Sequence, residues 1–411
     1  MNKPAIDIII NKLYKIKELD IIKPSAKKII SVVLTLCVLS AIFIPASAAD
    51  KNADIKKLLQ FNSDGTFKIM MINDTQDTDH TSIKMLNFIN KALDTEKPDL
   101  VVFVCDNVAD FFIGATKARV NKAIDNIIQP LVKRGIPFAV VFGNHDEETG
   151  VSKEDQMAMY TSYANCYAVD EGSSLSGVGT YNLPILSSDG TKSVFNIYMM
   201  DTHNKDVNGD YDGVHADQIA WYEATSNALK AANGGKVVPS LLFEHIPVAE
   251  IFKLLKKIPL GTDGAVRNGS KWYTLNENLA QGTLLVNPCN TVANNGQYDS
   301  WLKQGDIAGA FFGHDHANNF AGKTEDGIKM GYNGGTGFRA HDNGDKRSIR
   351  IFNINENDPA NYETHSIYYG DLMNDHFNFY ISDIISLRWF DIIFTKVYQI
   401  FEKLTLGVFK F

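Results

Sequence analysis

The first half of the chain alternates between short apolar runs and longer segments in which apolar residues recur every three or four positions. Apolar runs at 67–72, 100–104 and 137–142 predict strands, and unbroken apolar runs of this kind are typical of parallel sheets buried on both faces. Helical periodicity marks the segments 82–93 and 116–132. The resulting β-α-β-α-β order predicts right-handed crossovers and an α/β fold.

The second half repeats this pattern less regularly. Further elements are predicted as strands at 194–200, 237–243 and 307–312 and as a helix at 216–231. The runs 327–332 and 348–354 are interpreted as antiparallel strands of a second sheet. The segment 172–190 is rich in Ser and Gly, which is typical of a surface loop.

The N-terminal residues 1–49 have the pattern of a secretory signal with a long extension before it. Basic residues at 23–28 precede an apolar run at 29–44, and small residues follow at 45–49. This order predicts cleavage after Ala48 or Ala49 and a secreted or cell-envelope protein. The alternative is an uncleaved membrane anchor, although the apolar run is short for a membrane span.

The C-terminal residues 376–411 differ from the domain predicted at 50–375. They combine a wide apolar face with interspersed Lys and Arg residues, which predicts an amphipathic helix. Two interpretations remain for this helix. It either packs on the catalytic domain or self-associates, or it lies in a membrane interface.

Composition and charge narrow the class of protein. The chain has 411 residues, of which 45% are hydrophobic and 21% charged, so it is globular. Its net charge of -8 indicates no nucleic-acid-binding surface. Bound metals can still attract a phosphoanion. Export would permit a disulfide between Cys166 and Cys289, a pairing that spacing alone does not establish. Cys105 is interpreted as a packed thiol.

Polar motifs follow several of the predicted strands. They are Asp74-Thr75-Gln76, Asp106-Asn107, Gly143-Asn144-His145-Asp146, His245 and Gly313-His314-Asp315-His316. Because ligands bind beyond the carboxyl ends of parallel strands, these residues are expected to converge on one edge of a sheet. Carboxylate, amide and imidazole side chains hold two divalent metals in phosphoester hydrolases, where the metals acidify a water and neutralise the phosphoryl oxygens.

The order of these motifs resembles that of the calcineurin-like metallophosphoesterase superfamily, over about residues 67–320. The closest likeness is to the branch of small purple-acid-phosphatase-like and yeast cell-cycle-regulator-like phosphatases. It is carried by Phe243-Glu244-His245-Ile246-Pro247, residues 218–223 and residues 313–320. The resemblance implies a four-layer αββα sandwich with two mixed β-sheets flanked by helices.

The resemblance also implies a role for each motif residue. Asp74, Gln76 and His316 would hold the first metal, and Asn144, His245 and His314 the second. Asp106 would bridge the two metals, and the nucleophile would be a metal-bridging hydroxide. His145 would contact the phosphate and protonate the leaving oxygen as a general acid.

The sequence departs from the family pattern at two positions. Gln76 stands where the family usually has His, and Cys105 where it usually has Gly. An amide oxygen is a harder ligand than imidazole, so among Mn, Mg, Fe, Zn and Ca the first site is expected to favour the harder ions. The segment after Asp106 has no Tyr, so no Fe(III)-tyrosinate colour is expected.

Weaker interpretations concern residues around the motifs. Asn107, Asp146, Asn319 and Arg339 are candidates for supporting the ligands or reaching substrate, as are Asp201 and His203. For Arg339 the competing interpretation is an ordinary surface residue. Asp77 and Asp79 are interpreted as part of a solvated loop.

These features predict an exported metal-dependent phosphomonoesterase that acts on a small phosphorylated substrate. The alternatives are a phosphodiesterase or nucleotidase, which the same ligands and acid would serve, and a metal-binding pseudoenzyme of the cell envelope. Gln76 and Cys105 favour the pseudoenzyme, whereas His145 and the complete set of ligand positions favour an enzyme.

Overall fold

A computed structural model describes residues 58–109, 112–170, 174–259, 262, 264–291, 295–340 and 344–376. The predicted signal segment at 1–49 lies outside these residues, and so does the predicted C-terminal helix apart from His376. Within the described ranges, no helix combines the length and apolar character needed to cross a membrane.

The predicted β-α-β-α-β unit forms one side of the fold. A five-stranded sheet has the order β15-β14-β1-β2-β3. Its strands are β1 (Thr66–Asn73), β2 (Leu100–Val104), β3 (Phe138–Val141), β14 (Ser348–Asn355) and β15 (Glu363–Tyr368). As predicted, β1, β2 and β3 are parallel neighbours, whereas β14 pairs with β1 in the antiparallel direction.

A second sheet contains seven strands in the order β10-β12-β13-β11-β6-β5-β4. They are β4 (Tyr181–Leu186), β5 (Ser193–Met200), β6 (Ser240–Glu244), β10 (Ala280–Thr283), β11 (Ile307–Phe312), β12 (Asn319–Lys323) and β13 (Lys329–Tyr332). β5, β6, β11 and β13 are successive parallel neighbours. A small third sheet is formed by β7 (Leu255–Ile258), β9 (Lys271–Leu275) and β8 (Val266–Asn268).

Two predictions about the second half were wrong. β13 and β14 lie in different sheets, because β13 pairs in parallel with β11 and β14 pairs with β1. The segment 172–190 is not only a loop, since it contains β4, which pairs antiparallel with β5. Apolar periodicity identifies a strand but not the strand it pairs with, because strand pairing depends on contacts with residues far away in the sequence.

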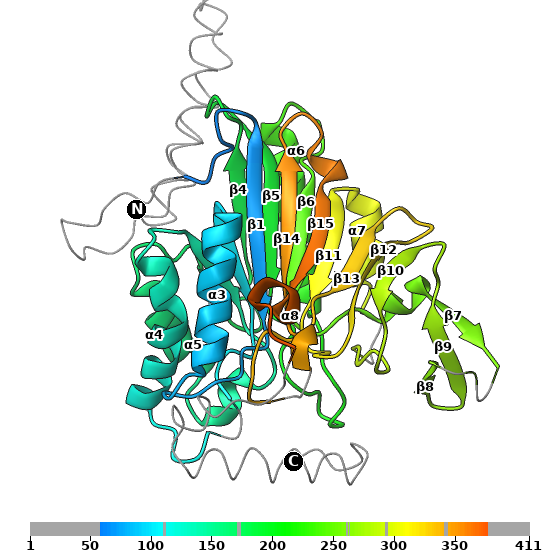
Figure 1. Ribbon diagram of the computed structural model, residues 1–411. Helices are drawn as coiled ribbons and strands as arrows, with labels where there is room; N and C mark the ends of the chain where they lie inside the picture. Colours follow the sequence, from blue (N-terminus) through cyan, green and yellow to red (C-terminus); the bar gives the residue numbers. More distant parts are fainter. Residues whose placement is uncertain are drawn as a thin grey trace, which may run out of the picture. The chain divides into compact units, whose positions relative to one another are not determined.

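Helices cover the outer faces of the two sheets (Figure 1). Their bounds are α3 (Ile83–Glu96), α4 (Lys117–Val132), α5 (Lys153–Thr161), α6 (Ala216–Ala232), α7 (Gln297–Gln304) and α8 (Tyr369–Met373). Short 3-10 turns occur at η1 (Asp146–Thr149), η2 (Ala249–Leu254), η3 (Gly344–Lys346) and η4 (Pro359–Asn361). The hydroxyls of Ser82 and Thr116 accept hydrogen bonds from the first turns of α3 and α4, which fixes where these helices begin.

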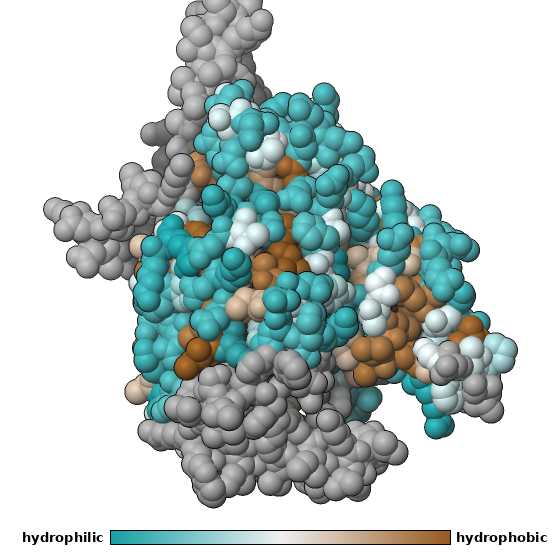
Figure 2. All heavy atoms as spheres, viewed as in Figure 1, coloured by the Kyte–Doolittle hydropathy of each residue, from teal (hydrophilic) through white to brown (hydrophobic). Residues whose placement is uncertain are grey.

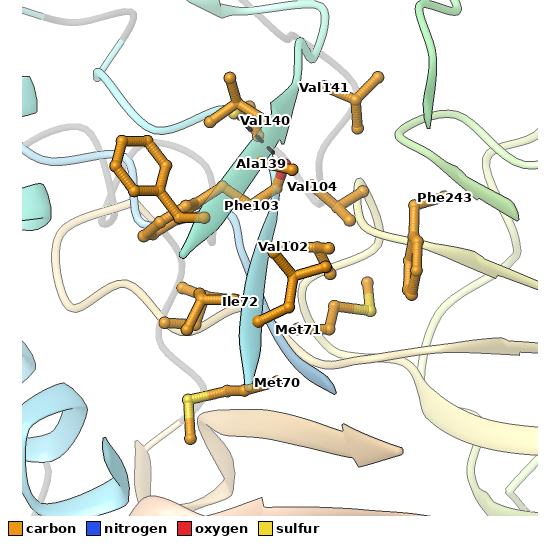
Figure 3. Close-up of a cluster of buried hydrophobic side chains, with 14 of the residues drawn as sticks. Met70, Met71, Ile72, Val102, Phe103, Val104, Ala139, Val140, Val141 and Phe243 are labelled. Carbon is orange, nitrogen blue, oxygen red and sulfur yellow. Dashed lines mark hydrogen bonds between the residues drawn. The ribbon is translucent and has the colours of Figure 1, made fainter. Parts of the chain in front are cut away.

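The two large sheets pack face to face. The ring of Phe352 on β14 lies 4.6 Å from Phe311 on β11 and 5.5 Å from Phe243 on β6, measured between ring centroids. Figure 3 shows Val102 and Val104 of β2 on the side of their strand that faces Phe243. One core joins the sheets to α3 and α4, and a second core joins the seven-stranded sheet to α6 and α7. The predicted four-layer αββα arrangement is therefore confirmed.

The exterior in this view is largely hydrophilic, with hydrophobic atoms in a few limited patches (Figure 2). Cys166 and Cys289 are thiols and do not form the disulfide that export would permit. Cys166 pairs with Phe138 beside the five-stranded sheet, whereas the backbone N–H of Cys289 donates to Asp315 beside the seven-stranded sheet.

Candidate metal centre

Five strand ends bring the predicted ligands to one edge of the sandwich. Asp74 directly follows β1, and Asp106 and Asn144 come shortly after β2 and β3. His245 directly follows β6, and His314 comes shortly after β11. Within each sheet these strands run parallel, so their carboxyl ends lie together. Ligand atoms of Asp106, His245 and His314 all lie within 4.8 Å of one another.

Asp74 and Asp106 lie among the predicted imidazole ligands. His245 Nε2 lies 2.9 Å from Asp106 Oδ2 and 3.9 Å from Asp74 Oδ1. His316 Nε2 lies 3.3 Å from the same Asp74 oxygen. Asp74 is therefore near histidines of both predicted metal sites, and Asp106 is the carboxylate in contact with His245.

Four buried oxygens at this edge accept no well-aligned hydrogen bond among the described residues, although two of them lie close to imidazole nitrogens. They are Asp74 Oδ1, Gln76 Oε1, Asp106 Oδ2 and Asn144 Oδ1. Leaving a buried polar atom unsatisfied costs about 1–3 kcal/mol, so such atoms are rare in folded proteins. Two carboxylates, two amide oxygens and three imidazoles form a donor set that suits divalent metal ions. The residues present therefore fit the predicted metals.

The backbone at these positions is strained. Asp74, Gln76, Asp106 and His314 have φ angles of 50°, 31°, 58° and 70°. Residues other than glycine seldom adopt this left-handed region, and those that do cluster at binding and active sites. Four of the seven predicted ligands therefore have this backbone conformation, which Lys97, His203 and Asn374 share outside the ligand set.

Asp146 holds the loops after β2 and β3 together. Its carboxylate accepts hydrogen bonds from the backbone N–H groups of Asp106 (3.1 Å), Asn107 (3.0 Å) and Gly143 (2.8 Å). Burial, with the charge of Asp106, raises the pKa of Asp146 to about 6. At Gly143, an added Cβ would lie 2.1 Å from Asp106 Oδ1, so only glycine allows this close approach. Asp146 thus supports the candidate ligands, as predicted from its position.

A chain of hydrogen bonds connects Asp74 to Arg350 through the interior. Each side chain in the chain donates a hydrogen bond to the next one. The bonds run from Arg350 to Asn319 (2.8 Å), to Ser348 (3.0 Å), to Asn333 (2.9 Å), to Asn73 (2.6 Å) and to Asp74 (2.6 Å). The aligned amide dipoles run from a buried cation to a buried carboxylate. This polar chain stabilises both charges and fixes the orientation of Asp74.

Replacing Asn333 by Ala removes the central link of this polar chain. We expect metal affinity to fall about 10–100-fold, because hydrogen-bonded partners of metal ligands typically contribute that much. Isothermal titration with Mn²⁺ measures the change. Asn361→Ala, on the exposed η4 turn, is the matched control. Unchanged Mn²⁺ affinity in Asn333→Ala would show that Asp74 keeps its position without the chain.

His145, the predicted general acid, is partly exposed and paired with an acid. Its ring Nδ1 lies 2.7 Å from Glu148 Oε2, and 28% of the side chain is exposed. Its backbone N–H donates to Asp106 Oδ1 at 2.8 Å. Burial opposes ionisation of Glu148, but the bond to His145 lowers its pKa overall. Sequence reasoning missed Glu148, although its spacing of three residues from His145 was a usable signal.

Tyr211 is a second residue at the site that sequence reasoning missed. Its ring meets the ring of His314 edge-on, with centroids 4.5 Å apart. On the other side, His314 lies 5.2 Å from His245, again edge-on. Tyr211 lies in a polar loop after β5, and no periodicity or motif in that loop indicated contact with a ligand.

Asn319 binds Ser348, Arg350 and Ser366 and is connected to Asp74 through the polar chain, while Asn318 donates to Asp315 of the histidine loop at 3.1 Å. The prediction for Arg339 needs correction. Arg339 is neither a surface residue nor placed to reach substrate, because only 2% of it is exposed.

Arg339 forms an ion pair with Asp77, and their side chains come within 2.5 Å. The guanidinium also donates to the carbonyl of His80. Asp77 is therefore fully buried and does not belong to a solvated loop, which corrects the prediction. Asp79 is also paired, through both of its oxygens, with Arg119.

Replacing Arg339 by Met leaves the Asp77 carboxylate buried without its cation. We expect the free energy of unfolding to fall by about 3–5 kcal/mol, as for other broken buried ion pairs. Urea denaturation measures it. In the control Arg134→Met, the partner Asp94 has 62% of its side chain exposed, so a loss below about 1 kcal/mol is expected. If the two variants lost the same free energy of unfolding, burial would not explain the strength of the Arg339–Asp77 ion pair.

The remaining candidates have structural contacts. Asn107 donates to Tyr160 Oη at 2.9 Å and to Cys105 Sγ at 3.1 Å. Asp201 is buried and forms an ion pair with Lys153 at 2.8 Å. Burial, with nearby carboxylates, raises the pKa of the Cys105 thiol well above its usual range. Cys105 is therefore a packed thiol without thiolate reactivity, as the sequence indicated.

His203 and Glu244 also lie close to the ligand loops. The His203 ring stacks on His215, with centroids 4.0 Å apart, and its Nε2 lies 3.1 Å from Gln218 Oε1. Burial raises the pKa of Glu244, which directly precedes His245, to about 8, although the hydrogen bond from Gln297 opposes this effect.

Comparisons with known proteins identify a family and several relatives. Residues 67–318 match the family model described as calcineurin-like phosphoesterase. "Probable inactive purple acid phosphatase 14" of Arabidopsis thaliana is 28% identical over 338 residues, covering 72% of this chain and 77% of that protein. "Phosphatase DCR2" of Saccharomyces cerevisiae is 27% identical over 67% of this chain and 46% of that protein. A solved dimetal phosphatase from Danio rerio is 12% identical, covering 74% of this chain and 99% of that chain, with a TM-score of 0.47.

Proposed function

This chain belongs to the calcineurin-like phosphoesterase family, and we propose that it hydrolyses phosphomonoesters. Members of this family are phosphoric ester hydrolases that depend on two metals. The substrate would be a small phosphorylated molecule. The observation that carries the proposal is the group of buried, unsatisfied oxygens beside three histidines at one edge of the sandwich.

In this proposal Asp74, Gln76 and His316 would hold one metal, Asn144, His245 and His314 would hold the other, and Asp106 would be the carboxylate shared by the two. When bound, two divalent metals supply an activated water and positive charge for the phosphoryl oxygens. The harder Gln76 ligand favours Mn²⁺, Mg²⁺ or Ca²⁺ over Zn²⁺ at the first site.

The protein's own acid would be His145. Its imidazole donates a proton to the leaving oxygen, and the Glu148 carboxylate 2.7 Å away orients the ring. The backbone N–H of His145 is anchored on Asp106. The acid is therefore tied to the residue that organises the metals, which fixes its distance from the reacting phosphate.

Preference for a monoester over a diester is tested with nitrophenyl phosphate and bis-nitrophenyl phosphate, each assayed with added Mn²⁺. We expect kcat/KM for the monoester to be higher. Faster turnover of the bis-ester would overturn the monoesterase proposal and support the phosphodiesterase or nucleotidase alternative. Metal binding without turnover of either ester would support the pseudoenzyme alternative. One relative of this chain is named a probable inactive phosphatase, which favours that alternative.

We also propose that the protein is exported. The support is the order of basic, apolar and small residues before position 50. Mass spectrometry of the protein recovered from the producing cells would identify its first residue. A start at residue 49 or 50 is expected. Full-length protein held in the membrane would support the uncleaved anchor instead. The helix predicted for residues 376–411, and its packing on the catalytic domain, self-association or binding to a membrane, stay predictions.

A further inference from the structure

A groove lies apart from the metal centre, where β12 and β13 of one large sheet approach β14 and β15 of the other (Figure 1). It has a volume of about 450 Å³. None of the predicted metal ligands lines it. Its volume falls within the usual range for sites that hold small molecules.

The lining of this groove is basic. Lys323, Lys329 and Arg350 line it together with the hydroxyls of Thr364 and Ser366, and the lining residues include no Asp or Glu. The protein as a whole is acidic, with a net charge of -8. Three cations gathered without a carboxylate form a local positive site on an otherwise negative molecule.

Arg350 is the best buried of these cations, with only 4% exposed. Its Nη atoms donate only to neutral acceptors, namely Thr364 Oγ1 (3.3 Å), Asn319 Oδ1 (2.8 Å) and the Tyr332 carbonyl (2.9 Å). Among the described residues, Nε has no partner and no carboxylate pairs with this guanidinium. The buried Lys153, by contrast, has Asp201 at 2.8 Å. The polar chain to Asp74 offsets part of the cost of burying this cation, and an anion in the groove would offset more of it.

Lys329 and Tyr362 complete the basic wall. Lys329 Nζ donates to the Tyr362 carbonyl at 2.9 Å and lies 4.2 Å from the centroid of its ring. The buried Tyr362 Oη has no hydrogen-bond partner among the described residues. Burial and the neighbouring Lys323 lower the pKa of Lys329, and the charge of Asp358 only partly opposes this effect.

We propose that this groove is a second, metal-independent binding site for a phosphate group, carried by a small molecule or present as inorganic phosphate. Lys329 and Lys323 would supply charge-assisted hydrogen bonds, Thr364 a neutral one, and Arg350 the positive charge of its buried guanidinium, while the Ser366 hydroxyl already donates to Asn319 Oδ1. A doubly charged anion with several oxygens matches three cations and a hydroxyl better than a single carboxylate does.

Isothermal titration of inorganic phosphate into the EDTA-treated protein tests this site, because removal of metals prevents phosphate from binding at the metal centre. One site is expected. Lys323→Met and Lys329→Met should each weaken binding about tenfold or more, and Arg350→Met should abolish it. Lys256→Met, on the separate three-stranded sheet, is the matched control and should bind as the unmodified protein does. Acetate at the same concentration should not compete.

Three results would overturn the proposal. They are no phosphate binding without metals, unchanged binding in both lysine variants, and competition by acetate as strong as that by phosphate. The lysine variants keep the test decisive if Arg350→Met fails to fold, since Lys323 is exposed and Lys329 only partly buried. Because the titration needs neither metal nor turnover, its outcome is independent of the phosphomonoesterase proposal.

Discussion

Replacing Asp106 by Asn is expected to lower kcat/KM for nitrophenyl phosphate by more than about 100-fold. Substitution of a partner that only supports a ligand already costs 10–100-fold, so loss of the shared carboxylate should cost more. The Asp106 oxygens lie 2.9 Å from His245 Nε2 and 2.8 Å from the His145 backbone nitrogen. Asn keeps the shape of the side chain but removes the negative charge between the two predicted metals.

The Asp106→Asn protein should also bind less metal, as measured by atomic absorption after dialysis. Asp94→Asn, on the surface of α3, controls for the loss of one carboxylate and should retain both activity and metal. If Asp106→Asn retained full metal content and full activity, Asp106 would not be the bridging ligand.

Replacing His145 by Ala is expected to lower kcat by about 10²–10⁴-fold, the usual contribution of a general acid. Metal content should not change, because His145 is assigned to the leaving oxygen and not to a metal. The basic limb of the pH–rate profile, where the imidazole loses its proton, should disappear as well. Steady-state kinetics between pH 5 and 9, together with metal analysis, measures these effects.

Glu148→Gln is the matched companion to His145→Ala. It keeps the imidazole but weakens the contact at Nδ1, which is 2.7 Å in the unmodified protein. A smaller loss of kcat is expected, with the basic limb shifted to lower pH because a stabilising negative charge is removed. Full activity of His145→Ala would refute the assignment of His145 as the acid.

The convergence of candidate ligands on one edge was predictable from the sequence because two local signals coincide there. Apolar runs such as 100–104 identify buried parallel strands, and the carboxyl ends of parallel strands lie together. Residues that follow such runs, including Asp74 and Asp106, were therefore predictable as neighbours. Both residues also have a left-handed backbone conformation, which the sequence did not predict.

The features that the sequence did not predict depend on long-range partners. Arg339 and Asp77 form a buried ion pair across 262 positions, and nothing near either residue indicates the other. Asn333 and Asn73 are separated by 260 positions, and their hydrogen bond links Asp74 to the opposite end of the interior. Apolar periodicity likewise did not reveal that β13 and β14 belong to different sheets. Such pairings depend on the packing of the whole core and not on the local sequence.

A two-metal phosphatase site at the edge formed by β1, β2, β3, β6 and β11 is best tested by hydrolysis of nitrophenyl phosphate. The protein is stripped of metal and then titrated with Mn²⁺, Mg²⁺, Ca²⁺ and Zn²⁺. We expect no turnover in the stripped protein, and turnover restored by Mn²⁺ or Mg²⁺ in the unmodified protein but not in Asp106→Asn. Tight metal binding without turnover of the mono- or the bis-ester, with any of these ions, would contradict a phosphatase site.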